Sequence, residues 1–121
     1  MAQNLIGVTS MLPKVLCSTQ LSATTATTLY TAPAGTSAIV KHGVACNTSA
    51  APVNVTLSIV PSGGTADGTH RVISAFPLAA GDSLPLGPYI GGANLGPGDF
   101  ISAQASVAAV LDVVLTGVES T

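Results

Sequence analysis

Charged residues are scarce in this sequence. Lys and Arg together number three and Asp and Glu five, which is 7% of 121 residues, against about 25% in an ordinary soluble domain. No cluster of basic residues is present that could neutralise a run of phosphates, so we expect no nucleic-acid partner. A net charge of −2 also gives little repulsion between copies. This composition favours a protein that spends its time inside a larger assembly.

Aromatic residues are rarer still, at 3% of the chain, and Trp is absent. The four aromatic side chains are Tyr30, Phe76, Tyr89 and Phe100. Small sugar-binding β-domains usually hold their ligand on aromatic platforms, so this scarcity argues against a carbohydrate-binding module for host adhesion. That module remains the alternative from a different functional class. The core must be built from Val, Leu, Ile and Ala.

Long apolar runs are missing too. The longest, near VAAVLDVVL, is interrupted by Asp112 and is too short to span a bilayer. The opening MAQNLIGVTSMLPK lacks a basic region before its apolar residues, so we expect no signal peptide and no membrane partner. The two cysteines, Cys17 and Cys46, could pair if their strands are neighbours. The alternative is two separate small buried thiols.

What the sequence does contain is alternation with a period of two, which is typical of half-buried strands. In PVNVTLSIV, Val53, Val55, Leu57 and Ile59 alternate with polar residues. The same pattern recurs in DFISAQAS, with Ile101, Ala103 and Ala105, and again at Leu111, Val113 and Leu115. Further strands are expected around residues 14–19, 27–31, 37–46, 70–76 and 83–86, and no stretch shows a convincing helix pattern. Seven or eight short antiparallel strands predict a single all-β domain, a small β-sandwich or jelly roll.

Gly/Pro segments such as TAPAGT, LAAGD and LGPGD separate these strands and predict tight turns. The candidate structural turn residues are Pro33, Gly35, Gly81, Asp82, Gly98 and Asp99. Asp82 and Asp99 each follow a glycine before a strand, and Asp in such a place commonly caps the turn through its own backbone. Calcium needs six or more clustered oxygens, which these dispersed acids do not supply. We therefore expect no metal and no cofactor.

The stretch KHGVAC places Lys41, His42 and Cys46 close together in sequence. On a strand, His42 and Cys46 share a face, but a spacing of four residues is about 13 Å, too far for a Cys–His dyad. His70 is the only other histidine, so a metal site lacks ligands. We interpret this stretch as an amphipathic strand and expect no catalytic residues and no enzyme. NTS at residues 47–49 and NVT at residues 54–56 match the N-glycosylation sequon. We expect the first to lie in a turn and the second on the face of a strand.

Two longer stretches, LYTAPAGTSAIVKHGVACNTSAAPVNVTLSIVPSGG and PLAAGDSLPLGPYIGGANLGPGDFISAQAS, resemble small β-sandwich virion proteins of tailed bacteriophages. The resemblance covers roughly residues 27–118 and rests on turn and strand motifs. It implies a non-enzymatic structural protein of the virion, either a capsid decoration (cement) protein or a minor tail or tail-tip component. We expect the partners to be the major capsid protein or tail proteins and further copies of the chain. A low-charge β-domain can bury its strand edges against its copies, and the symmetric oligomer expected is a trimer.

The N-terminal segment MAQNLIGVTSMLP has no clean strand or helix period, and Pro13 separates it from the first expected strand. We therefore divide the chain into an N-terminal arm, residues 1–13, and a β-sandwich domain, residues 14–121. The candidate subunit or shell contacts on this arm are Leu5, Ile6, Val8, Met11 and Leu12. The alternative is a short extra strand that caps its own sandwich.

Overall fold

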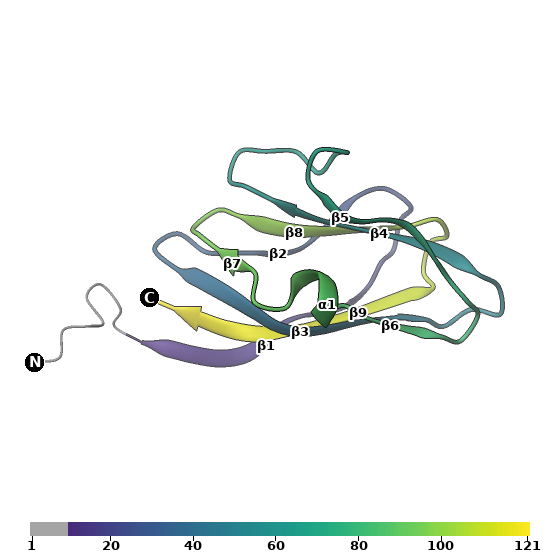
Figure 1. Cartoon of the computed structure of the whole chain (residues 1–121), viewed down its shortest axis with the longest axis horizontal. Helices are drawn as coiled ribbons and strands as arrows, with labels where there is room; N and C mark the ends of the chain where they lie inside the picture. Colours follow the sequence, from purple (N-terminus) through teal and green to yellow (C-terminus); the bar gives the residue numbers. More distant parts are fainter. Residues whose placement is uncertain (1–9) are drawn as a thin grey trace, which may run out of the picture.

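Two antiparallel sheets pack face to face in the computed structural model, which describes residues 10–121 (Figure 1). Sheet A has the order β1 (Met11–Gln20), β9 (Leu111–Ser120), β3 (Ser37–Asn47) and β6 (Ser83–Pro85), and β7 (Asn94–Leu95) also pairs with β3. Sheet B has the order β2 (Thr27–Thr31), β8 (Phe100–Ala105), β4 (Val53–Val60) and β5 (Arg71–Leu78). The expected all-β sandwich is confirmed.

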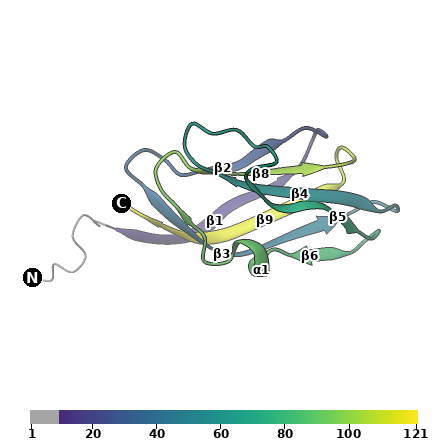
Figure 2. The same ribbon diagram turned by 45° about the horizontal axis from the view of Figure 1, so that its top comes forward.

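The strand pairing is nested along the chain. β1 pairs with β9, β2 with β8, β3 with β6 and β4 with β5, all antiparallel. The connectivity is that of one long hairpin folded over on itself, with β4 and β5 at its closed end in sheet B (Figure 2). From β1 to β4 each strand lies in the sheet opposite to the one before it. With the short β7 set aside, this order is that of a jelly roll, whose eight strands form two Greek keys.

The core lies between the two inner faces and follows the predicted alternation. On β4, β8 and β9 the apolar members of each alternating run are buried: Val53, Val55, Leu57, Ile101, Ala103, Ala105, Leu111, Val113 and Leu115. Ile59, the last member on β4, is half-buried and packs against this core. Ser58 and Val60 of β4 are buried as well, although they point to the other side of sheet B. Val60 lies close to Gly64 of the segment that follows β4, so this connection covers part of the side of sheet B that faces away from the core.

Two β-bulges lie opposite the same part of β9. The β1 register shifts between Val15 and Cys17, and the β3 register shifts between Val40 and His42. An extra residue in one strand moves every later side chain to the other face. Val40 therefore points into the core, whereas His42 and Val44 point out. Gly117 of β9 lies in the tight space between the bulges, where a Cβ would clash with the Ile39 carbonyl and the Leu16 side chain.

One short helical turn, α1 (Gly87–Ile90), closes a side of the sandwich. It lies between β6 and β7 and contacts both β3 and β5. Leu86, Ile90 and Leu95 from this segment are fully buried, and the Leu86 amide donates to the Gly43 carbonyl at 2.8 Å. A single turn is too short to produce a helical period in the sequence. No helix within residues 10–121 has the length and apolar character needed to cross a membrane.

The first strand begins earlier than the division after Pro13 assumed. β1 starts at Met11, and Pro13 pairs with Val118 of β9. Because β1 is an edge strand, Pro13 can be accommodated although it has no N–H to donate. Met11 and Leu12 thus belong to sheet A, where they are 57% and 55% exposed. The remaining residues named for the arm, Leu5, Ile6 and Val8, lie outside the described residues.

Candidate interaction surface

On the surface of sheet A that faces away from the core, six of the nine side chains in the three central rows are apolar. Cross-strand register aligns Pro13 with Val118 and Ile39, Val15 with Thr116 and His42, and Ser18 with Val114 and Val44. We call this surface the outer face; its six central apolar residues are Pro13, Val15, Ile39, Val44, Val114 and Val118. Val15 is 55% exposed and Val44 38% exposed, and an aliphatic face of this kind is typical of a contact surface.

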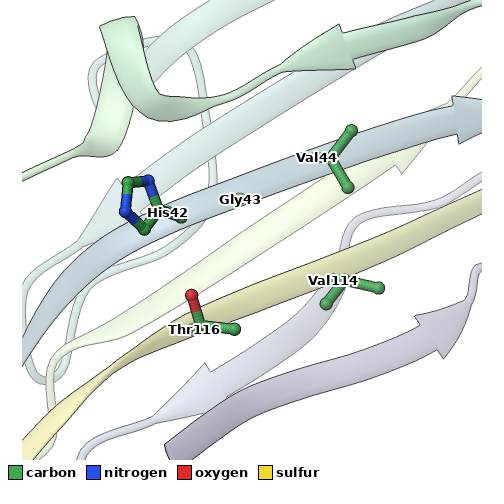
Figure 3. Close-up of a pocket in the computed structure, with 5 residues that line it drawn as sticks. All are labelled: His42, Gly43, Val44, Val114 and Thr116. Atoms are coloured by element: carbon green, nitrogen blue, oxygen red, sulfur yellow. The ribbon is translucent and has the colours of Figure 1, made fainter. Parts of the chain in front are cut away.

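A shallow depression of about 220 Å³ lies on the outer face (Figure 3). His42, Gly43 and Val44 of β3 line it together with Val114 and Thr116 of β9. Val44 and Val114 contribute aliphatic side chains to it, and the His42 ring makes no hydrogen bond or ion pair with any residue in the range 10–121. The depression therefore suits a protruding apolar side chain of another protein better than a polar substrate.

Charges are few on the outer face. Lys41 is exposed at the β3 bulge, and Asp112 accepts a hydrogen bond at 2.9 Å from the Gln20 amide. The ion pair between Lys14 and Glu119 involves residues whose register places them on the opposite side of sheet A. The pKa of Glu119 is held below its ordinary value, chiefly by the hydrogen bond from Tyr30 and also by Lys14. The outer face thus presents one formal charge of each sign.

The other exposed sheet face, on sheet B, is polar. Asn54, Thr56, Arg71 and Gln104 are among the residues that line a depression of about 270 Å³ there. Thr56 and Gln104 are register partners on β4 and β8. The protein therefore has two chemically different faces, one aliphatic and one rich in hydroxyl and amide groups.

The Lys41, His42 and Cys46 stretch forms no reactive cluster. His42 and Cys46 do lie on the same side of β3 with Val44 between them. Cys17 and Cys46 are free thiols, because β9 lies between their strands and keeps them apart. Within residues 10–121 no three His, Cys, Asp or Glu side chains come together as a group that could hold a metal ion. The His70 ring bonds within its own loop, where its Nδ1 lies 2.8 Å from the Thr65 carbonyl oxygen, and the His70 carbonyl accepts from the Ile59 amide of β4.

The residues predicted to form structural turns lie in three turns of the same type. In each, an amide donates to the carbonyl three residues earlier: Thr36 to Pro33, Asp82 to Ala79, and Asp99 to Gly96. The third residue of each turn, Gly35, Gly81 or Gly98, has a positive φ of 73°, 70° or 86°. These are type II turns, which favour Gly at that position.

The two aspartates of these turns bind backbone amides. Asp82 accepts from the Ser83 amide at 2.9 Å. Asp99 accepts from the Gly96 amide within its own turn and from the Ser62 amide of a neighbouring loop, both at 2.8 Å. Their carboxylates hold loops in place, in keeping with a structural role for both.

The two sequon asparagines differ sharply in exposure. Asn47 is fully buried, and its amide nitrogen donates to the carbonyls of Ala51, Leu78 and Ala79 at 2.8 to 3.2 Å. Asn54 is exposed on β4. The folded protein therefore keeps the side chain of Asn47 out of reach of any modifying enzyme.

The outer face was not visible from the sequence. In a half-buried strand the positions of Val114 and Val118 on β9 would be polar. Their apolar character was the one sign in the sequence that this side of β9 is also a contact surface. Val15 and Val44 join them only through the pairing of β1 and β3 with β9. Comparison with protein-family models, with curated proteins and with solved structures gives no significant match.

Proposed function

We propose that this protein is a non-enzymatic structural component of a bacteriophage virion, a capsid decoration protein that binds the shell as a symmetric oligomer and associates with other copies through the outer face of sheet A. The observation that carries the proposal is that face: aliphatic at its centre, nearly uncharged and open to solvent in a single chain. Exposed apolar surface of this kind marks a site of association.

The fold and the composition support the same function. Jelly rolls are common in viral capsid proteins, although the fold also serves lectins and enzymes and does not by itself define a function. A chain with 7% charged residues has little electrostatic repulsion to oppose dense packing on a shell. The resemblance of residues 27–118 to small virion proteins of tailed phages points in the same direction.

Two other functions remain as alternatives. A minor tail or tail-tip component would use the same fold and the same outer face in rings along the tail. A carbohydrate-binding module would use the polar depression of sheet B. The residues lining that depression include Asn54, Arg71 and Gln104 but no aromatic side chain on which a sugar could stack, so this alternative is the weaker one.

The proposal is tested by locating the protein in particles from cells that produce it. An antibody against the recombinant protein is applied to gradient-purified virions, and label on the heads is the expected result. Label confined to tails would overturn capsid decoration in favour of the tail alternative. Protein found only in the particle-free fraction would overturn a virion function altogether.

A further inference from the structure

We propose that the outer face of sheet A is the contact between two copies of this chain, packed face to face about a twofold axis. The inference rests on the proposed assembly function and names the partner of the same surface. Three features of the structure support it: the state of the sheet edges, the size of the face and its charge.

The edges of the sheets are poor sites for adding strands from another copy. β1 carries Pro13 and a bulge at Leu16 along its free edge. On the far side of sheet A, the edge is divided into β6 and β7 by the α1 turn. In sheet B, β5 contains Pro77 and Ala75, the latter with a positive φ of 51°, and β2 is only five residues long. Devices of this kind prevent edge-to-edge pairing, which leaves the face as the surface for association.

The size of the outer face meets the requirement for a specific dimer. β1 and β9 have 10 residues each and β3 has 11. Strands of this length measure about 33 Å, and three of them side by side span about 14 Å. The short β6 and β7 add only five residues at one edge. Two such faces therefore bury about 1,100 Å² in total, just above the roughly 1,000 Å² that a specific interface should exceed.

The charge of the face permits two identical surfaces to meet. Its formal charges are one cation, Lys41, and one anion, Asp112, so the face has no net charge to repel its copy. A single self-complementary face closes at two copies, whereas a threefold ring needs two different complementary surfaces on each copy. The second sheet face is polar, so we infer a twofold pair in place of the trimer expected from the sequence.

The test compares two lysine substitutions at valines of equal exposure. Val44, on the outer face of sheet A, and Val72, on β5 of sheet B, are both 38% exposed, so neither change removes a buried side chain. Sedimentation equilibrium of the unchanged protein should give twice the chain mass of 11.8 kDa. Val44→Lys places an ammonium group from each copy in an apolar interface and should raise the dimer dissociation constant about 100-fold or more. Val72→Lys should leave the dissociation constant unchanged.

Other outcomes would overturn the proposed dimer. They are a monomer at the highest concentration reached, a mass of three chains, or an equal effect of both substitutions. Should Val44→Lys lose its circular dichroism spectrum, Val15→Lys takes its place, because Val15 is 55% exposed on an edge strand. The dimer and the virion function are tested separately. A dimer that never accompanies particles would refute the function alone, and a particle-bound monomer would refute the dimer alone.

Discussion

The Tyr30 hydroxyl donates a hydrogen bond to the Glu119 carboxylate and thereby connects β2 of sheet B to β9 of sheet A. The other carboxylate oxygen of Glu119 lies 3.3 Å from the Lys14 ammonium of β1. The Tyr30 side chain is part of the core, with only 9% of the residue exposed. One carboxylate thus joins three strands from both layers at the end of the sandwich where β1 begins and β9 ends.

Removal of the Tyr30 hydroxyl should weaken the fold. Tyr30→Phe keeps the ring in the core but deletes the hydrogen bond to a charged group, which costs about 1.5–3 kcal/mol of unfolding free energy. Urea denaturation followed by circular dichroism measures the change. Tyr89→Phe is the matched control, because Tyr89 is 41% exposed and its hydroxyl has no hydrogen-bond partner within residues 10–121. Equal stability of the two variants would contradict a role for the Tyr30–Glu119 contact.

Tyr30 should also resist ionisation by alkali. Burial raises its pKa above the ordinary value, and the hydrogen bond and the charge of Glu119 raise it further. The unfolded chain releases this proton near pH 10, whereas the folded protein retains it. The contribution of Tyr30 to stability is therefore complete below about pH 10 and is lost as the pH rises toward the folded pKa.

The Tyr89→Phe variant leaves Tyr30 as the single tyrosine of the chain and so gives a clean optical signal. Its tyrosinate absorbance should appear only above the usual tyrosine range, together with loss of the β-sheet circular dichroism signal. Ionisation near pH 10 with the fold intact would show that Tyr30 is not held as the structure indicates.

The strands could be predicted from the sequence wherever one face is buried and the other is polar. On β4 and β8 the apolar side chains fall on one face, and alternation locates these strands without any knowledge of their neighbours. The bulges at Leu16 and Lys41 could not be found in this way. Each depends on how β1 or β3 is aligned against β9, and that alignment joins segments far apart in the sequence.

The outer face was hidden for the same reason. Val15, Val44 and Val114 come from three strands, and each looks unremarkable in its own segment. They form a surface because β9 lies between β1 and β3, an order that no local pattern specifies. The turns behave differently, since a type II turn depends on four consecutive residues and a glycine in third position is a local signal.

Gly35 offers a test of backbone strain without steric interference. Its φ is 73°, and a Cβ placed on it would have no neighbour within 4 Å. Gly35→Ala should therefore cost about 1–2 kcal/mol from the left-handed conformation alone. Gly68 is equally open but lacks a positive φ, so Gly68→Ala should leave the melting temperature nearly unchanged. Indistinguishable melting temperatures for the two variants would argue against the type II turn at 33–36.

Asn47 should be among the least replaceable polar residues. Its amide satisfies three backbone carbonyls, and its side-chain oxygen accepts from the Ser49 amide and hydroxyl at 3.0 and 2.8 Å. Asn47→Asp would direct a carboxylate at those carbonyls in a buried site, so we expect a loss of more than about 3 kcal/mol. Asn54→Asp makes the same chemical change at an exposed site and should alter stability by less than about 0.5 kcal/mol. Similar losses in urea denaturation would refute the special role of Asn47.

The two cysteines should react with thiol reagents at very different rates. Cys17 is 9% exposed and burial raises its pKa, whereas Cys46 is half-buried on the outer side of β3. Since the thiolate is the reactive form, a disulfide reagent should label one thiol per chain quickly in folded protein that is diluted until the proposed dimer dissociates, and both thiols in denaturant. Cys46→Ser should abolish the fast reaction, and Cys17→Ser should preserve it. Denatured protein without free thiols would instead reveal a disulfide, and equal rates in the two variants would show that Cys17 is as accessible as Cys46.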